Sequence, residues 1–278
     1  MKPSLVVYGN CQADWVERAM RVVPEITDRF DTYYVYSFDH PVSGLAKPDP
    51  EVLGRCAVLL EQRGAWDRFP WRDAVPASAQ VVTFPVLTMD ALWPLTTFSD
   101  PRNVPVLPDY PYGVFPYGDR LISDWLASGV SREETLQRYL TWSVRESEDL
   151  PRVREMNQVR LEMADEHCDV KMADAVLTGL TDEPLFYTCN HPRPAVLSML
   201  VDRILERSAL VNGALPAVSR TVRALFDDCR PNSMIEIPVH PDVAGTFGLS
   251  WYRDDLKYCC YTLVDASYED YWRAYTSY

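Results

Sequence analysis

Two residues that lie 180 positions apart have the types that nucleophilic catalysis needs, and Cys11 is the first. It stands in VVYGNCQADW, where a short apolar run passes through Gly9 and Asn10 into a predicted helix. The dipole and free N–H groups of a helix N-terminus stabilise a thiolate, lower the pKa of a cysteine and can form an oxyanion hole. The turn therefore predicts a nucleophile, and the alternative is a small buried residue in a tight turn.

His191 is the second of these residues, because a nucleophilic thiol needs a base within hydrogen-bond reach. It follows the predicted strand EPLFYT and precedes a predicted helix, with Pro192 suited to the first helical turn. If the strands before Cys11 and His191 are parallel neighbours, both side chains emerge at the carboxyl edge of one sheet as a Cys/His dyad. The alternative is that Asn190 and His191 only cap the helix.

Polar side chains flank both candidates. Asn10 and Gln12 stand on either side of Cys11 and offer amide donors for an oxyanion, and Asn190 precedes His191. The group that orients the imidazole stays open among four residues: Asp119, Asp174, Asp242 and Asn190.

Four polar or basic residues lie near the predicted site edge and are candidates for holding an anionic cofactor. Gln62 and Arg63 follow the predicted strand CAVLLE, and Arg193 lies in the first turn of the helix after His191. Lys171 stands alone in a long stretch without lysine. The alternative for each is a solvated surface charge.

The stretch 85–118 is rich in proline and aromatic residues and has no helical or strand period. A long irregular segment inside a compact domain is typically functional or a linker, and the aromatic content favours a loop packed over a site. Its candidates for stacking on a sugar or an adenine are Tyr110, Tyr112, Phe115 and Tyr117. The alternative is the ordinary packing of a lid.

The elements that must position these residues form an α/β pattern. Short apolar runs alternate with helical segments, which favours a parallel sheet with crossover helices. The predicted strands are Ser4–Tyr8, Thr32–Tyr36, Cys56–Glu61 and Gln80–Phe84. We expect a parallel-type central sheet flanked by helices, in a single domain over 1–278 with a largely helical insertion at about 119–178.

The composition excludes several classes of protein. A net charge of −13 repels nucleic acid and anionic lipid surfaces. No apolar run approaches the ~18 residues that span a membrane, and no export signal is present, so we expect a cytoplasmic protein. The seven cysteines, without a CxxC pair, are then reduced thiols. No metal-ligand cluster occurs, so no metal is expected, and no GxGxxG or P-loop motif supports nucleotide binding by those routes.

The motifs in this order resemble the WcbI-like polysaccharide-biosynthesis family. The resemblance rests on GNCQ, the FP-containing Pro/Tyr-rich segment, DVKMADAV, LFYTCNHP with its amphipathic helix, and PVHPDVAGTFGLSW. It implies a coenzyme A-dependent O-acetyltransferase, with Cys11 and His191 as the reactive pair and Gln12 and Asn190 as their motif neighbours. The implied donor is acetyl-CoA or another acyl-CoA, and the implied acceptor is a saccharide or a similar hydroxylated small molecule.

Two other functions fit the same residues. An esterase or thioesterase can use the same dyad, and a non-catalytic protein can bind coenzyme A or a sugar in the same place. The layout is similar to that of the SGNH hydrolases, in which a serine in the first strand-to-helix turn works with a late histidine. Here Cys11 replaces the serine, and no Asp-x-x-His motif is present because Thr188, Cys189 and Asn190 precede His191. This departure disfavours a simple hydrolase.

Overall fold

The computed structural model describes residues 1–37, 48–64, 68–98, 100, 102–103, 113–211, 213–231 and 233–278. The chain falls into two compact units, each assembled from three segments. The first comprises Met1–Leu87, Gln158–Thr178 and Pro192–Pro231, and the second comprises Thr88–Asn157, Gly179–His191 and Asn232–Tyr278. A single domain over the whole chain stays a prediction.

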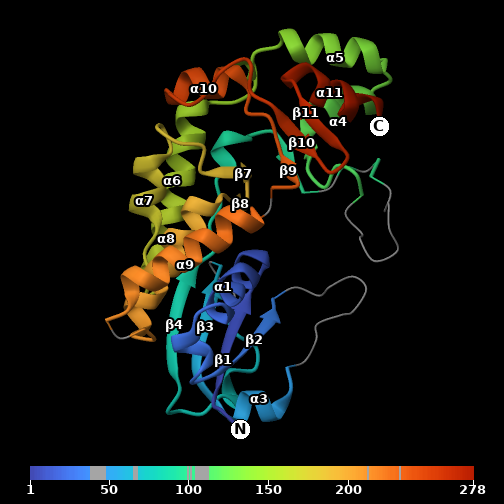
Figure 1. The fold of residues 1–278 in the computed structure, drawn as a ribbon. Coiled ribbons are helices and arrows are strands. Elements are labelled where there is room, and N and C mark those ends of the chain that lie inside the picture. The colour runs from blue at the N-terminus through green and yellow to red at the C-terminus, as the bar shows by residue number, and fades with distance from the viewer. Residues whose placement is uncertain are drawn as a thin grey trace. The chain divides into compact units, whose positions relative to one another are not determined.

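The first unit is built on a four-stranded parallel sheet in the order β2-β1-β3-β4 (Figure 1). Its strands are β1 (Ser4–Gly9), β2 (Asp31–Tyr36), β3 (Cys56–Arg63) and β4 (Gln80–Pro85). Each falls on a predicted strand, because short apolar runs that end in turn residues fit a buried parallel sheet. The predicted α/β class with a parallel central sheet is confirmed.

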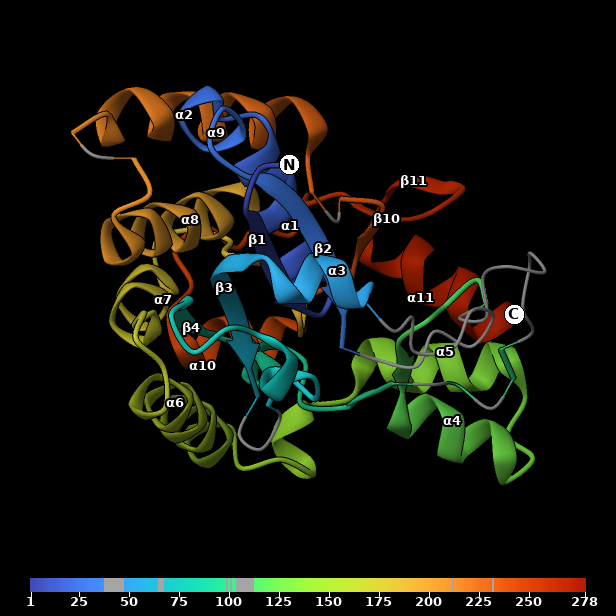
Figure 2. The same cartoon turned by 90° about the horizontal axis from the view of Figure 1, so that it is seen from below.

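Helices cover this sheet. The helix α1 (Cys11–Arg21) packs on β1 and β2, and α8 (Pro194–Ser208) packs on α1 and β4. The helix α9 (Leu215–Cys229) lies alongside α8 (Figure 2). On the side of Val6 and Tyr8, the core is closed by α3 (Pro50–Gly54) and Phe69. The remaining short helix is α2 (Pro24–Thr27).

Two helices continue from one unit's segment into the other's. They are α6 (Leu150–Glu166) and α7 (Ala173–Gly179). Residues of the predicted helical insertion at about 119–178 belong to both units, and their standing as an insertion into one domain stays a prediction.

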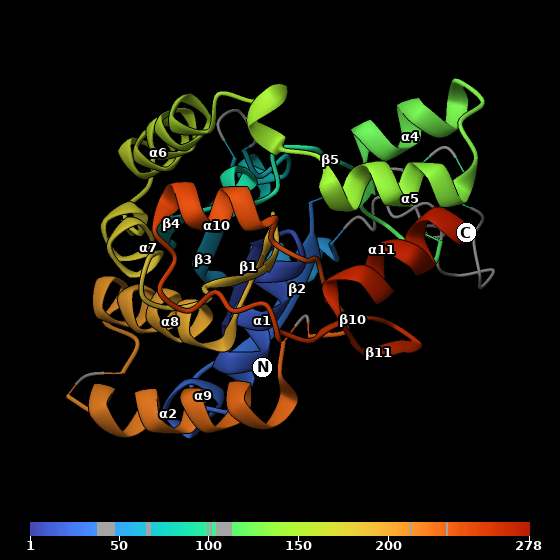
Figure 3. The same ribbon diagram turned by 90° about the horizontal axis from the view of Figure 1, so that it is seen from above.

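The second unit holds helices and small sheets. Its helix α5 (Arg132–Thr141) packs against α4 (Arg120–Ala127) and α11 (Tyr268–Ser277) (Figure 3). A further helix is α10 (Pro241–Phe247). The strands form an antiparallel sheet in the order β11-β10-β9 and two pairs, β5 with β6 and β7 with β8. They are β5 (Thr96–Thr97), β6 (Gly118–Asp119), β7 (Phe186–Thr188), β8 (His191–Pro192), β9 (Ile235–Glu236), β10 (Tyr258–Cys260) and β11 (Leu263–Ala266).

Side-chain caps begin three helices of the second unit. Asp119 accepts from the backbone N–H of Ile122 at the start of α4, and Ser131 accepts from that of Glu134 at the start of α5. Ser267 and Asp270 form a reciprocal capping box at α11. Such caps satisfy N–H groups that lack a partner within the helix, and each stabilises the helix by about 1 kcal/mol.

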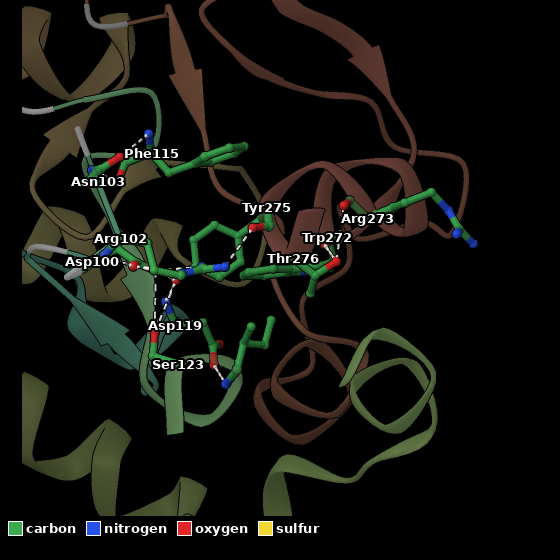
Figure 4. Close-up of polar contacts among 11 residues, drawn as sticks. Asp100, Arg102, Asn103, Phe115, Asp119, Ser123, Trp272, Arg273, Tyr275 and Thr276 are labelled. Atoms are coloured by element: carbon green, nitrogen blue, oxygen red, sulfur yellow. Dashed lines mark hydrogen bonds and ion pairs between the residues drawn. The ribbon is translucent and has the colours of Figure 1, made fainter. Parts of the chain in front are cut away.

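A buried carboxylate–tyrosine network joins α11 to residues around β6 (Figure 4). We use this name for Asp100, Arg102, Asp119, Ser123, Tyr139 and Tyr275. Arg102 forms an ion pair of 2.7 Å with Asp100, whose carboxylate also accepts from the Tyr275 hydroxyl. The backbone N–H of Asp119 donates to Tyr275 Oη at 2.9 Å. These bonds satisfy charges that burial would otherwise penalise.

In the part of the chain that the structure describes, no helix is both long and apolar enough to cross a membrane.

Candidate functional site

The strand order of the first unit locates a ligand-binding edge. The chain leaves β1 toward β2 on one side and later crosses to β3 on the other, so the order reverses between β1 and β3. In open parallel sheets, ligands bind outside the carboxyl ends of the strands at such a switch point. Gly9 ends β1 and Gln62 lies near the end of β3, so the GNCQ turn stands at this point.

Gly9 is required by the close approach of its neighbours. A Cβ at this position would lie 2.3 Å from Gln62 Oε1 and 2.6 Å from the Cβ of Ala13. The same Gln62 Oε1 accepts a 2.8 Å hydrogen bond from the backbone N–H of Asn10. The carboxyl ends of β1 and β3 are thereby joined by a buried side-chain amide.

Gln12 extends this connection to the end of β4. Its side chain donates to the carbonyl of Leu87 at 2.8 Å and accepts from the N–H of Leu87 at 3.0 Å. Gln62 Nε2 donates to Gln12 Oε1 at 3.0 Å. Both glutamine side chains are buried, so the ends of three strands share one satisfied amide network.

The sequence predicts that Gln62 and Arg63 follow the strand. In the structure they are the last two residues of β3. The bonds of Gln62 brace the GNCQ turn, a function that sequence reasoning missed. Tyr34 was also missed: its hydroxyl donates to the carbonyls of Gly9 and Asn10 at 3.2 and 3.0 Å. The sequence feature that could have identified Tyr34 is its place in the strand TYYVY, which pairs it with Val7 of β1.

Cys11 is the first residue of α1, and Asn10 is its N-cap, accepting from the N–H of Gln12 at 2.9 Å. Burial raises the pKa of the thiol to about 11, although the N–H groups of Cys11 and Gln12 act in the opposite direction. The predicted lowering of the thiol pKa is therefore wrong in sign, because desolvation outweighs the helix N-terminus. The thiol is neutral near pH 7.

His191 lies in the second unit, in β8. The strand before it, β7, pairs with β8, and the four-stranded sheet of the first unit contains only β1 to β4 among the described residues. The expectation that Cys11 and His191 share one sheet edge is therefore wrong, since a hairpin-like pair replaces the predicted parallel neighbour. The pairing of the two side chains as a dyad stays a prediction.

The turn around His191 is held by Asn190. Asn190 Oδ1 accepts from the Tyr117 hydroxyl at 2.6 Å and from Thr188 Oγ1 at 3.1 Å. The Tyr117 ring meets the His191 ring edge-on, with centroids 5.8 Å apart at 90°. The predicted neighbour Asn190 and the predicted aromatic Tyr117 are thus brought together with His191 in one unit.

His191 is half-buried, and the partial burial lowers the pKa of its imidazole to about 4. Its Nδ1 has no hydrogen-bond partner within the described residues. Asp119 instead binds Tyr139 and Ile122, and Asp242 binds Ser143. Asp174 binds Arg203, and Asn190 accepts from Tyr117. None of the four candidates for orienting the imidazole therefore binds Nδ1.

The three basic candidates occupy separate places in the first unit. Arg63 is half-buried and pairs with Glu61 at 3.3 Å. Lys171 is exposed, and its ammonium donates to the carbonyl of Asp165. Arg193 is the N-cap residue of α8 and lies just before the helix, not in its first turn, because the helix begins at Pro194. Their role in binding a cofactor stays a prediction.

The aromatic candidates divide into two kinds. Phe115 is buried against the rings of Tyr271, Tyr275 and Tyr278, which assigns it to packing and leaves it no free face for a substrate. Tyr117 keeps part of its surface exposed. The other two, Tyr110 and Tyr112, lie outside the described residues.

No group of three or more His, Cys, Asp or Glu side chains in the described ranges is arranged to hold a metal ion. None of the seven cysteines forms a disulfide bond, and all seven lie in the described ranges.

Comparisons with known proteins place the chain. No curated protein sequence matches it. A solved structure of WcbI, described as a novel polysaccharide biosynthesis enzyme, superposes with a TM-score of 0.72 at 16% identity, covering 100% of this chain and 93% of that one. That structure is described as the native protein without a disulfide bond between coenzyme A and one of its cysteines. The model of the family described as "Polysaccharide biosynthesis enzyme WcbI" matches residues 4–212. The chain therefore belongs to the WcbI family of polysaccharide biosynthesis enzymes.

Proposed function

We propose that this enzyme transfers an acyl group from a coenzyme A thioester, with acetyl-CoA as the simplest donor, to a hydroxyl group of a saccharide. Cys11 and His191 are the reactive pair. The proposal requires the Cys11 sulfur and the His191 ring to approach to about 3 Å in the productive complex. Family membership supports a role in polysaccharide biosynthesis, and the description of the WcbI structure supports coenzyme A near a cysteine.

One observation carries the proposal. In GNCQ, Gly9 makes room for Gln62, Asn10 caps α1, and Gln12 clamps Leu87. Every residue of the motif except Cys11 has a structural task. A buried network of this quality, placed at the switch point of a parallel sheet, is well suited to hold one side chain in a fixed position. That side chain is the Cys11 thiol.

The reaction has two balanced routes. In the covalent route, Cys11 Sγ attacks the thioester carbonyl, His191 takes the thiol proton, and coenzyme A leaves as a thiolate that receives this proton. The acceptor hydroxyl then gives its proton to His191 and attacks the acyl-cysteine, and Cys11 recovers the proton. In the direct route, His191 takes the proton of the acceptor hydroxyl, whose oxygen attacks acetyl-CoA, and the same proton passes to the departing thiolate.

The pKa values constrain when the proton moves. A thiol with a pKa of about 11 beside an imidazole with a pKa of about 4 stays a neutral pair at pH 7. A resting thiolate–imidazolium pair is therefore disfavoured, and proton transfer accompanies the attack. The backbone N–H of Cys11 is suited to stabilise the oxyanion that forms, because those of Asn10 and Gln12 already donate to Gln62 and to the Asn10 side chain.

The test uses the whole chain with acetyl-CoA. We expect His191→Ala to lose at least about a hundredfold in kcat by either route, because both use it as the base, and Cys11→Ala to lose as much when the covalent route operates. Cys229→Ala, which changes an exposed free cysteine, serves as the matched control and keeps full activity. Full activity of both site variants contradicts the site assignment.

Two further measurements separate the routes and the competing hydrolase. Intact-mass analysis after incubation with acetyl-CoA gives an adduct of one acetyl group, absent in Cys11→Ala, only if the covalent route operates. Release of coenzyme A without any acceptor measures hydrolysis. Rapid release that no saccharide accelerates contradicts transferase activity and supports a thioesterase.

A further inference from the structure

An aromatic row leads from the surface of the second unit to His191. We use this name for Phe98, Tyr117 and His191. The Phe98 and Tyr117 ring centroids lie 6.2 Å apart, with the rings tilted by 59°, and those of Tyr117 and His191 lie 5.8 Å apart. Phe98 is 67% exposed, Tyr117 is partly exposed and His191 is half-buried, with its Nδ1 atom shielded from solvent. The row therefore presents an open ring at one end and the proposed base at the other.

The middle ring of the row is fixed in place. The Tyr117 hydroxyl donates to Asn190 Oδ1 at 2.6 Å, and Asn190 also binds Thr188. Tyr117 is thus attached to the residue that precedes the proposed base. A phenylalanine as exposed as Phe98 gives up the burial that normally stabilises such a side chain. An exposed ring next to a fixed ring is typical of a surface that stacks on a ligand.

Charge decides which ligand fits this surface. The second unit holds 10 basic and 20 acidic side chains, a net charge of −10. Several of its arginines already pair with carboxylates, including Arg102 with Asp100, Arg120 with Glu148 and Arg138 with Glu134. The diphosphate of coenzyme A needs cations, so a donor is disfavoured here. A neutral sugar ring needs none.

We propose that Phe98 and Tyr117 form the acceptor subsite, where the apolar face of a neutral saccharide ring stacks. The C–H bonds on one face of a pyranose carry small positive charges and meet the negative face of an aromatic ring. A sugar seated on this row presents a ring hydroxyl toward His191. The name acceptor subsite rests on the proposed function. Binding of a saccharide to Phe98 and Tyr117 can be measured whether or not acyl transfer occurs.

Binding is tested on the whole chain by saturation-transfer NMR. The probes are methyl β-D-glucopyranoside, methyl α-D-mannopyranoside and cellobiose, each titrated to obtain a dissociation constant. We expect at least one probe to bind through its C–H face and Phe98→Ala to weaken it at least about fivefold, whereas Phe98→Trp retains it. Val264→Ala is the matched control, because Val264 lies in the same unit and is 68% exposed. Lack of binding by all three probes, or equal binding by Phe98→Ala, overturns the subsite.

A second arm tests the donor at the same place. Adenosine 3′,5′-bisphosphate, the nucleotide end of coenzyme A, is titrated against the same variants. We expect Phe98→Ala to leave its affinity unchanged. If the affinity for this nucleotide falls and that for the glycosides does not, the row binds the adenine of the donor and the acceptor proposal is wrong.

Kinetics separate this inference from the proposed function. With an active acceptor, Phe98→Ala raises the KM for the acceptor at least about fivefold and leaves coenzyme A release without acceptor unchanged. Tyr117→Phe keeps the ring but loses the bond to Asn190, so we expect glycoside binding to persist while kcat falls. Binding that depends on Phe98 in a protein without acyl transfer contradicts only the proposed function. Acyl transfer with an unchanged KM in Phe98→Ala contradicts only the subsite.

Discussion

The Cys11 turn and the carboxylate–tyrosine network both hold a turn rigid, but they do so with different groups. The first unit uses neutral amides: Gln12 and Gln62 join the ends of β1, β3 and β4. The second unit uses buried carboxylates, with Asp100 and Asp119 bound by arginine and tyrosine side chains. Amides do not titrate near neutral pH, whereas carboxylates do. The difference indicates that pH acts on the second unit more than on the Cys11 turn.

Charge separates the two units as well. The first holds 17 basic and 20 acidic side chains, a net charge of −3, against −10 for the second. The weaker negative charge of the first unit leads us to propose that it binds the anionic coenzyme A, while the neutral sugar is proposed to bind the second unit.

The largest expected effect breaks the amide-built turn. In Gly9→Ala the added Cβ meets Gln62 Oε1 at 2.3 Å, so Gln62 must shift and its bond to Asn10 is lost. We expect the free energy of unfolding to fall by about 3 kcal/mol and acyl transfer to fall at least about a hundredfold. Urea denaturation and hydrogen exchange of β1 and α1 measure the first change.

Gly54→Ala is the matched control for this prediction. Gly54 also lies in the first unit, and a Cβ there has nothing within 4 Å. This variant is expected to be neutral or slightly stabilised. Equal stability of the two variants shows that the turn tolerates the extra carbon. The amide network then does not hold the Cys11 turn rigid, and the contrast with the carboxylate–tyrosine network is wrong.

A pH-dependent effect follows from Asp119. Burial raises the pKa of this carboxyl to about 6 from 3.8. Because the folded-state pKa is raised, the stabilising contribution of the protonated group is fully present below pH 3.8 and is lost as the pH rises through 6. Asp119→Asn does not titrate, so its stability relative to the natural chain improves by up to roughly 3 kcal/mol between pH 4 and pH 7.5. Urea denaturation across this range measures the difference.

Asp124→Asn provides the control, because Asp124 lies in α4 and is exposed. Its stability difference from the natural chain is expected to stay flat across the same pH range. A flat difference for Asp119→Asn as well means that the buried carboxylate is not the source of the pH sensitivity.

The smallest effect sharpens the comparison of charge. We expect Arg63→Ala, Lys171→Ala and Arg193→Ala each to raise the KM for acetyl-CoA about three- to tenfold, more strongly at low salt. Arg132→Ala changes an arginine of the second unit at the start of α5 and is expected to leave this KM unchanged. If the variants of the first unit match the control, the donor phosphates bind elsewhere.

Much of the fold could be predicted because it depends on local pattern. Short apolar runs that end in turn residues locate β1 to β4. EPLFYT has the pattern of a buried strand, and a pattern does not say which sheet a strand joins, so the sequence did not reveal that β7 pairs with β8 outside the central sheet. Contacts between distant segments decide that each unit is assembled from three segments, and these too the sequence did not reveal.

The candidate site was predictable to a similar extent. The motif identified Cys11 and Gln12, because turn chemistry is local. The pKa direction of Cys11 was wrong, since burial is set by the whole fold. Gln62 was predicted to hold a cofactor, whereas its side chain braces the Cys11 turn. The sequence does not reveal this role, because its hydrogen bonds run to residues of other segments. Phe98 was missed, since nothing in a proline-rich stretch marks a single ring as exposed.

The discontinuous first unit has a consequence for synthesis of the chain. The Cys11 turn and its braces, Gln62 and Leu87, are all encoded within the first 87 residues, whereas α8, which packs on β4 and α1, begins at Pro194. At ribosomal rates of about 5–20 residues per second, the uncovered sheet waits roughly 5 to 20 s for this helix. During that interval the nascent chain exposes apolar strands, so its yield in the cell depends on chaperones or on the speed of translation through the middle of the gene.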